Sequence, residues 1–197
     1  MRVEEYSSNV VEIKPEQAPS VDLRMADAED FAEIKKLNLS ALALDPSAFG
    51  ERSIDRKIWT DEDWRQFIQS GHIQIGVNTH GELVAMAGAK IKEGDVWQLH
   101  SVYVDPVYRK NVDEKDRRLA ERLIAELIDT VQNEERATQI ELIVNQEKPA
   151  AVKLYERLDF VVTTELHDHL SADGLPHEKF VMSKNLRQEE EVLLLAA

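Results

Sequence analysis

A long amphipathic helical pattern lies between two strand patterns in the middle of this chain, and that order restricts its fold more than any other feature. Residues 113–132 predict the helix, because apolar side chains recur there at spacings of one, three and four positions. Strands are predicted on either side, over Val96 to Val104 and Ala137 to Val144. Such a strand–helix–strand succession is typical of two parallel strands joined by a crossover helix.

Further strand and helix patterns flank this unit. The other predicted strands are Val21 to Met25, Ile73 to Val77, Leu83 to Ile91, Phe160 to Leu170 and His177 to Ser183. The other predicted helices run from a capping-box-like Asp27–Asp30 pair to Leu42, from Thr60 to Ile68, and from Pro149 to Leu158. Turn residues between the early strands favour antiparallel pairing there. We expect an α/β fold (mixed α+β), with a mixed sheet of about seven strands and about four helices.

The length of 197 residues fits one domain with tails. A composition of 43% hydrophobic and 31% charged residues supplies one sizeable core and a polar surface. We expect an N-terminal extension over residues 1–20, which Pro15 and Pro19 interrupt, a domain over 21–186 and a C-terminal tail over 187–197.

Several classes of protein are excluded or disfavoured by composition. The chain has no cysteine, which excludes disulfides, a thiolate zinc site and a cysteine nucleophile. No apolar run approaches the ~20 residues that cross a bilayer, and the N-terminus does not resemble a secretory signal. A net charge of −14 argues against nucleic acid as a partner. It is compatible with a cationic small molecule or peptide, although solubility explains it equally simply. We expect a cytoplasmic protein with no membrane partner.

The strand pattern over residues 96–104 contains a change of phase. Trp97 and Leu99 share one parity, whereas Val102 and Val104 share the other. Strand side chains alternate strictly, so this change predicts a β-bulge near His100–Ser101, a feature common beside active sites. A strand buried on both faces is the alternative explanation.

Two segments, LHSVYVDPVYR and VNQEKPAAVKLYERLDF, resemble the acetyl-CoA-binding core of the GNAT N-acetyltransferases. The resemblance extends through LRMADAED, DPSAFG and HEKFVMSKNL, and so covers about residues 21–186. It implies a GNAT-like fold with a splayed sheet, acetyl-CoA as cosubstrate, and direct attack by a primary amine of a small molecule or peptide. Members of the family often dimerise, so a homodimer is one expected assembly.

The resemblance also implies which residues hold acetyl-CoA. The backbone of Val102, Tyr103 and Val104 would hold the pantetheine arm, and basic side chains would assist the phosphates; these are Arg109, Lys110, Lys115 and Lys148. The chain departs from the family pattern at four positions: Val112 and Glu114 replace loop glycines, Lys148 replaces an asparagine and Asp159 replaces a glycine. These departures support an alternative, an interaction or regulatory module that has lost normal CoA binding.

Catalytic roles are less clearly marked in the sequence. The resemblance implies that Tyr155 protonates the departing CoA thiolate; a core tyrosine is the alternative. His100 and Glu178 are the candidate bases, with Gln98 beside His100 and a water relay as a further option. Phe49, Gly50 and Trp59 are candidate linings of the acceptor pocket, and Trp64 is expected in the core. His167, His169 and His177 lie across one hairpin, but we expect no metal site, because histidines there are usually solvated.

Overall fold

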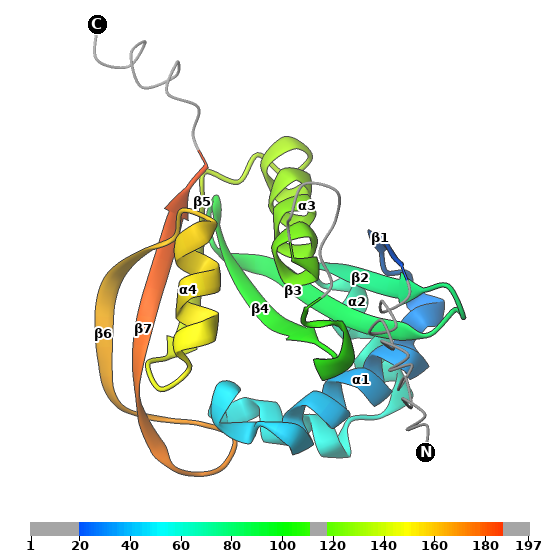
Figure 1. The fold of residues 1–197 in the computed structure, drawn as a ribbon, viewed down its shortest axis with the longest axis horizontal. Helices are drawn as coiled ribbons and strands as arrows, with labels where there is room; N and C mark the ends of the chain where they lie inside the picture. Colours follow the sequence, from blue (N-terminus) through cyan, green and yellow to red (C-terminus); the bar gives the residue numbers. More distant parts are fainter. Residues whose placement is uncertain (1–19, 111–117, 187–197) are drawn as a thin grey trace, which may run out of the picture.

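The computed structural model describes residues 20–110 and 118–186 and contains one mixed seven-stranded sheet, in the order β1-β2-β3-β4-β5-β7-β6 (Figure 1). The strands are β1 (Val21–Met25), β2 (His72–Asn78), β3 (Leu83–Glu93), β4 (Val96–Val104), β5 (Gln139–Asn145), β6 (Val161–Leu170) and β7 (Pro176–Asn185). Every strand predicted from the sequence is present, with ends that shift by at most a few residues.

Helices connect these strands. The α-helices are α1 (Phe31–Leu44), α2 (Asp61–Gln69), α3 (Leu119–Asn133) and α4 (Pro149–Arg157). Short 3-10 helices are η1 (Ala28–Asp30), η2 (Pro46–Ala48), η3 (Glu51–Ile58) and η4 (Pro106–Tyr108). Side-chain capping boxes start η1 at Asp27 and α2 at Thr60, as the sequence predicts. None of the described helices is long and apolar enough to cross a membrane.

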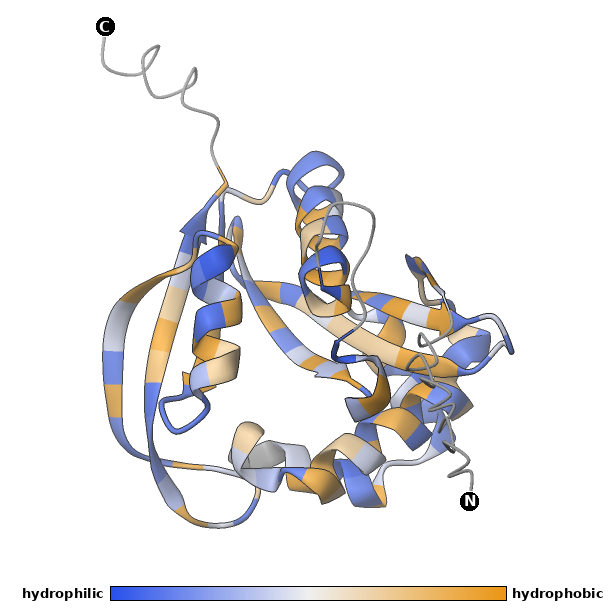
Figure 2. Ribbon diagram, in the orientation of Figure 1, coloured by the Kyte–Doolittle hydropathy of each residue, from blue (hydrophilic) through white to orange (hydrophobic). Residues whose placement is uncertain are grey.

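In the described residues α3 starts at Leu119, and the preceding Arg118 is extended, with φ −70° and ψ 153°. The predicted helix therefore does not run through Arg118. Its predicted start at residue 113 lies outside the described residues. From Leu119 onward the apolar face of α3 is buried, and polar residues occupy the rest of its surface (Figure 2).

The predicted crossover unit is confirmed. Strand β4 precedes α3 in the chain, β5 follows it, and the two strands pair in parallel. Every other neighbouring pair in the sheet is antiparallel. The parallel pairing is short, because it joins only Val96–Gln98 to Gln139–Glu141. Beyond these residues β4 and β5 diverge, with α4 on the β5 side (Figure 1).

The predicted bulge in β4 is also confirmed. Met86 pairs with Tyr103 and Gly88 pairs with His100, which leaves Ser101 and Val102 opposite Ala87 alone. Ser101 has a φ of 53°, a left-handed conformation that non-glycine residues adopt rarely. The bulge lies where β4 leaves β5, so it contributes to the splay of the sheet.

Two apolar cores cover the two faces of the sheet. One contains the buried faces of α3 and α4 with Tyr155 and Phe160, and the other contains α1 and α2 with Trp64. Trp64 is fully buried, as expected. The edge strand β6 is mostly exposed along its length, with polar and apolar residues interspersed (Figure 2). The described elements run from Val21 to Asn185; apart from Ser20, the extension and tail predicted at the termini lie outside the described residues.

Candidate active site

A cavity of about 480 Å³ occupies the opening between the diverging strands. One wall is the stretch of β4 from Leu99 to Val104, and the opposite wall is formed by β5 and the first turns of α4. Among the described residues, no strand pairs with this stretch of β4 on the β5 side, so its backbone is available to a ligand there. The splay of the sheet therefore creates both the cavity and its free hydrogen-bonding edge.

Four basic side chains line this cavity: Arg109, Arg118, Lys148 and Arg157. Arg109 donates from Nε to the carbonyl oxygen of Val104 at 3.0 Å, which fixes it beside β4. Lys148 pairs with Asp45 at 2.8 Å, and Arg157 pairs with Glu121 at 2.7 Å. With two acids in the lining, Asp45 and Glu147, cations outnumber anions around the cavity. The cavity thus fits a long ligand that carries negative charge.

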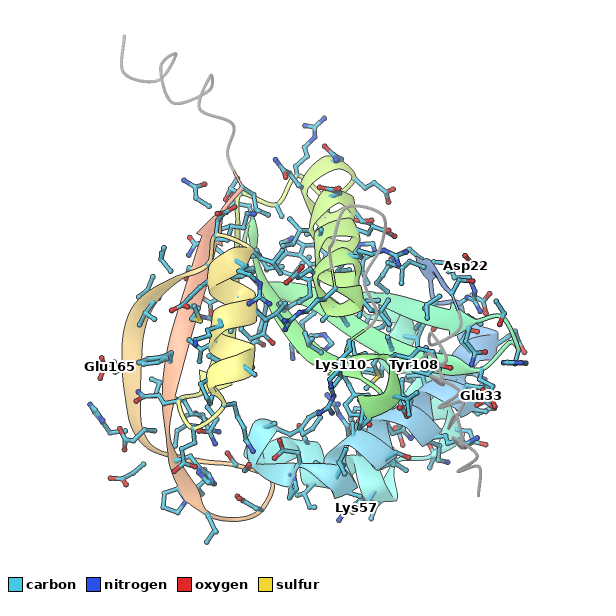
Figure 3. The ribbon with its side chains drawn as sticks, viewed as in Figure 1. Asp22, Glu33, Lys57, Tyr108, Lys110 and Glu165 are labelled. Atoms are coloured by element: carbon cyan, nitrogen blue, oxygen red, sulfur yellow. The ribbon has the colours of Figure 1, made fainter. Side chains whose placement is uncertain are left out.

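The sequence-predicted cofactor residues are largely brought together here. Val102, Tyr103, Val104, Arg109 and Lys148 all line the cavity. Lys110 does not; it follows Tyr108 and Arg109 just beyond the end of β4 (Figure 3). Lys115, Val112 and Glu114 lie outside the described residues.

Arg118 and Arg157 were not predicted as cavity residues. Arg118 belongs to the charged run before α3, and Arg157 belongs to the last turn of α4. Charged side chains in such places usually face solvent, so composition alone gives no signal for them. The convergence of the start of α3 and the end of α4 on one cavity is a property of the fold.

The Tyr155 side chain projects from α4 into the cavity wall and is 8% exposed. Its ring meets the ring of Phe160 edge to face, with 5.9 Å between centroids. No described residue forms a hydrogen bond with its hydroxyl. Burial raises the pKa of Tyr155 well above its usual value, so the phenol stays protonated at neutral pH and can donate a hydrogen bond into the cavity.

His100 lies at the bulge and packs closely over Gly88 of the neighbouring strand. Burial lowers the pKa of His100 to about 3, with smaller contributions from the positive charges of Arg56 and Lys90. Its Nδ1 lies 3.0 Å from the Ser101 hydroxyl oxygen. The imidazole is therefore neutral at pH 7 and holds an added proton only weakly, which is unfavourable for a general base.

A second cavity, of about 570 Å³, also borders His100. It is lined by Gly50, Ser53, Arg56, Trp59, Phe67, Ser70, Gly71, Lys90, Gln98, His100 and His169. Among the described residues, His100 alone lines both cavities. Of the residues expected around an acceptor, Gly50 and Trp59 lie in this second cavity, whereas Phe49 lies in the first.

Glu178, the other candidate base, lines neither cavity. The next residue, Lys179, is 3% exposed and points inward, so strand alternation turns Glu178 outward. Glu178 forms a 2.5 Å contact with His167 and accepts a hydrogen bond from the backbone of Asp168, and these two contacts lower its pKa. The structure does not bring this carboxylate to the cleft.

The three histidines of the β6–β7 hairpin do not converge. His167 contacts Glu178, His177 contacts Asp173 and Glu147, and His169 lines the second cavity. Among residues 20–110 and 118–186, no group of three metal-ligating side chains is placed to hold a metal ion.

Comparison with known proteins identifies the family. Residues 38–160, more than half of the chain, match the family model described as the acetyltransferase (GNAT) family. No curated protein matches the chain in sequence.

Solved structures share the fold at low sequence identity. A GNAT-family acetyltransferase from Streptococcus pneumoniae has a TM-score of 0.69 and 20% identity, covering 84% of this chain and 99% of its own. The Salmonella typhimurium protein yncA, whose structure contains its cofactor acetyl-CoA, has a TM-score of 0.67 and 17% identity, covering 86% and 96%. The ribosomal-protein-S5-alanine acetyltransferase from Vibrio fischeri has a TM-score of 0.68 and 14% identity, covering 85% and 94%. The family match and the shared fold agree with the splayed sheet and its cavity, and the chain belongs to the GNAT acetyltransferase family.

Proposed function

We propose that this protein transfers the acetyl group of acetyl-CoA to a primary amine by direct attack. The observation that carries the proposal is the meeting of two cavities at one bulge in β4. The first has the free strand edge and basic lining that suit acetyl-CoA, and the second is a separate space for the amine. Such an arrangement could bring a thioester and a nucleophile to the same point, which is what direct transfer requires.

Acetyl-CoA supplies the activated acetyl group, and the cavity residues hold and orient it. The stretch of β4 from Val102 to Val104 has no strand partner on the β5 side among the described residues. A pantetheine arm could pair there with the backbone groups that point to that side. Arg109 and Lys148, together with Arg118 and Arg157, lie where they can neutralise phosphate charge. A protein of the same fold was solved with acetyl-CoA, which supports the choice of cosubstrate.

In the chemical step the neutral amine nitrogen attacks the thioester carbonyl carbon, and the carbon–sulfur bond then breaks. Tyr155 donates its hydroxyl proton to the departing thiolate and regains a proton from solvent after the CoA thiol leaves. Burial makes the Tyr155 phenol a weaker acid than a phenol in water, because it raises the pKa of the hydroxyl. The same burial makes the thiolate a stronger base, so the proton transfer remains feasible. The proton released by the amine passes to water through the second cavity, because His100 holds a proton too weakly to store it.

The inactive alternative is less well supported. Although glycines are replaced in the phosphate loop, a cavity of about 480 Å³ with basic walls is present in the described part of the fold. Tyr155 lies in its wall with no hydrogen-bond partner among the described residues, and a purely structural tyrosine buried to this degree usually has one.

Release of the CoA thiol tests the proposal directly. Because the chain has no cysteine, a thiol-specific reagent detects only CoA and gives no background from the protein. We expect thiol release from acetyl-CoA that depends on both the native protein and an added primary amine. Acetyl-CoA without amine measures hydrolysis, and heat-denatured protein measures the uncatalysed reaction. No amine-dependent release across a panel of amines and amino acids would overturn the proposed activity.

A further inference from the structure

The second cavity contains a cation, Arg56, for which the described residues offer no counter-ion. Arg56 belongs to η3 and lies half-buried, and no described carboxylate is within ion-pair distance of its guanidinium. Burial lowers the pKa of Arg56 to about 10, so the side chain is still charged at neutral pH. Burying a charge without a partner is unfavourable, and sites that do so commonly supply the charge to a ligand.

The guanidinium of Arg56 is held in a fixed orientation. Its Nη1 donates to the side-chain oxygen of Asn38 at 3.0 Å and to the Ser101 hydroxyl at 3.1 Å. Its central carbon lies 4.9 Å from the Phe67 ring centroid and 5.5 Å from that of Trp59. No described residue accepts a hydrogen bond from Nε or Nη2. These nitrogens lie on the edges of the guanidinium that bind a carboxylate.

The rest of the lining of the second cavity also favours a negatively charged ligand. Its other ionisable lining residues are Lys90, His169 and His100, of which His100 is neutral, and its described lining contains neither aspartate nor glutamate. The whole chain carries a net charge of −14, but charges beyond a Debye length of about 8 Å are largely screened at physiological salt. The local lining therefore decides which ligand enters, and it disfavours a polyamine.

The anion site lies next to the point where the two cavities meet. Arg56 and His100 both contact the hydroxyl of Ser101, the residue at the bulge. A carboxylate paired with Nε and Nη2 of Arg56 would thus bind the same guanidinium whose Nη1 donates to Ser101 at the junction. An amine attached to the same or the next carbon as that carboxylate can reach the junction, whereas an amine on a long chain would extend past it.

We propose that the second cavity binds an amino-carboxylate, a small molecule whose primary amine lies one or two carbons from a carboxylate that pairs with Arg56. This inference rests on the proposed function, since it names the class of acceptor for the same transfer. Trp59 and Phe67 provide apolar surface for the remainder of such a molecule.

Matched ligand pairs test the proposal on the unaltered protein. Phenylalanine and 2-phenylethylamine differ only in the carboxylate, as do ornithine and 1,4-diaminobutane. We expect kcat/KM for acetyl transfer to be at least tenfold higher for the carboxylate-bearing member of at least one pair. We also expect that member alone, without acetyl-CoA, to raise the melting temperature of the protein. An equal or higher kcat/KM for both amines that lack the carboxylate would overturn the proposal.

A pair of adjacent variants tests the role assigned to Arg56. Arg56→Gln removes the buried charge, and Lys57→Gln removes an equal charge from the exposed neighbouring position (Figure 3). We expect Arg56→Gln to reduce the carboxylate preference at least tenfold and Lys57→Gln to retain it. Retention of the preference in Arg56→Gln would contradict the proposal. If Arg56→Gln fails to fold, Arg56→Lys replaces it. This variant keeps the positive charge but loses the two-pronged geometry of the guanidinium, so it should reduce the carboxylate preference by a smaller factor. The ligand pairs measured on the unaltered protein still test the proposal independently of either variant.

Different results would overturn the carboxylate preference and the proposed acetyl transfer. A protein that acetylates simple amines as well as amino-carboxylates overturns the inference and leaves the proposed transfer intact. A protein whose melting temperature responds to amino-carboxylates but not to acetyl-CoA overturns the proposed transfer and leaves the anion site intact.

Discussion

Tyr155 is the residue on which the proposed chemistry depends most. Tyr155→Phe keeps the ring and its contact with Phe160, and removes a hydroxyl that bonds to no described residue. We therefore expect little change in stability, an affinity for acetyl-CoA near that of the original protein, and a fall in kcat of at least tenfold. Steady-state kinetics with the preferred amine and urea unfolding provide the two measurements.

Tyr108 is a matched control for this change. Its exposure is also 8%, but its hydroxyl accepts a hydrogen bond from Asn78 at 2.8 Å and it lines neither cavity. Tyr108→Phe should lower the free energy of unfolding by about 1 kcal/mol and leave kcat unchanged. An unchanged kcat in Tyr155→Phe, under conditions where chemistry limits turnover, would reduce Tyr155 to a core residue.

His100 should make the protein less stable at acid pH. Its pKa is about 3 in the folded state, below the ~6.5 of an unfolded chain, so between these values the unfolded state binds more protons. Stability then falls as the pH falls, by roughly 2 kcal/mol between pH 7 and pH 5 from this group alone. His100→Gln removes that contribution, so its free energy of unfolding should depend less on pH over this range.

Urea unfolding at pH 7 and pH 5 measures the difference. The exposed His80→Gln, in the turn between β2 and β3, serves as the control and should keep the pH dependence of the original protein. The same pH dependence in His100→Gln would mean that the imidazole is not buried as described.

At the scale of elements, the sequence predicts the strands, helices and bulge, because each depends on side-chain periodicity along a short segment. The sequence does not mark Leu119 as the first residue of α3, because charged residues have adequate helix propensity and the pattern alone does not exclude Arg118 from the helix. Arg56 was missed for a related reason: no periodic pattern marks η3. Its burial follows from the position of η3 against the β4 bulge, which is a tertiary contact.

The end of α4 carries a substitution whose cost can be measured. Asp159 has a φ of 65°, and the amides of Asp159 and Phe160 donate to the carbonyls of Glu156 and Tyr155 in a Schellman arrangement. Glycine adopts this conformation without strain. Asp159→Gly should therefore raise stability by about 0.5–1 kcal/mol, which corresponds to a rise of about 1–4 °C in melting temperature.

Asp159→Ala separates conformational strain from charge. It removes the same carboxylate, including the 3.5 Å contact with Lys184, but keeps the Cβ atom that opposes positive φ. It should give no gain in melting temperature. An equal gain from both variants would assign the effect to the carboxylate instead.

The contact between β3 and the bulged β4 depends on Gly88. A Cβ atom added there would lie 2.8 Å from both the Nδ1 of His100 and the Cδ1 of Ile73, and nearer still to the Cε1 of His100. Gly88→Ala should therefore displace the imidazole at the cavity junction and lower the free energy of unfolding by about 1–3 kcal/mol. Gly50→Ala, where the added atom meets nothing within 4 Å, should change it by less than about 0.5 kcal/mol. Equal effects in urea unfolding would contradict this packing.

At the scale of the whole molecule, the site is a consequence of topology. Several parts of the two cavities come from different segments between residues 50 and 157. These segments are the diverging strands β4 and β5, the ends of α3 and α4, and η3. The resemblance to the GNAT family indicated the strand edge, Arg109, Lys148 and Tyr155 from sequence. It did not indicate the outward orientation of Glu178 or the second cavity's basic lining, because both depend on how the strands and η3 pack in three dimensions.

Binding of acetyl-CoA to the first cavity is the property on which the proposed transfer depends. Thermal unfolding of the full chain is followed while acetyl-CoA is raised to millimolar concentration. We predict a saturable rise in melting temperature, equivalent to about 2.7 kcal/mol when the ligand reaches 100 times its dissociation constant. No change in melting temperature at millimolar acetyl-CoA would contradict the assignment of the first cavity, and with it the proposed transfer.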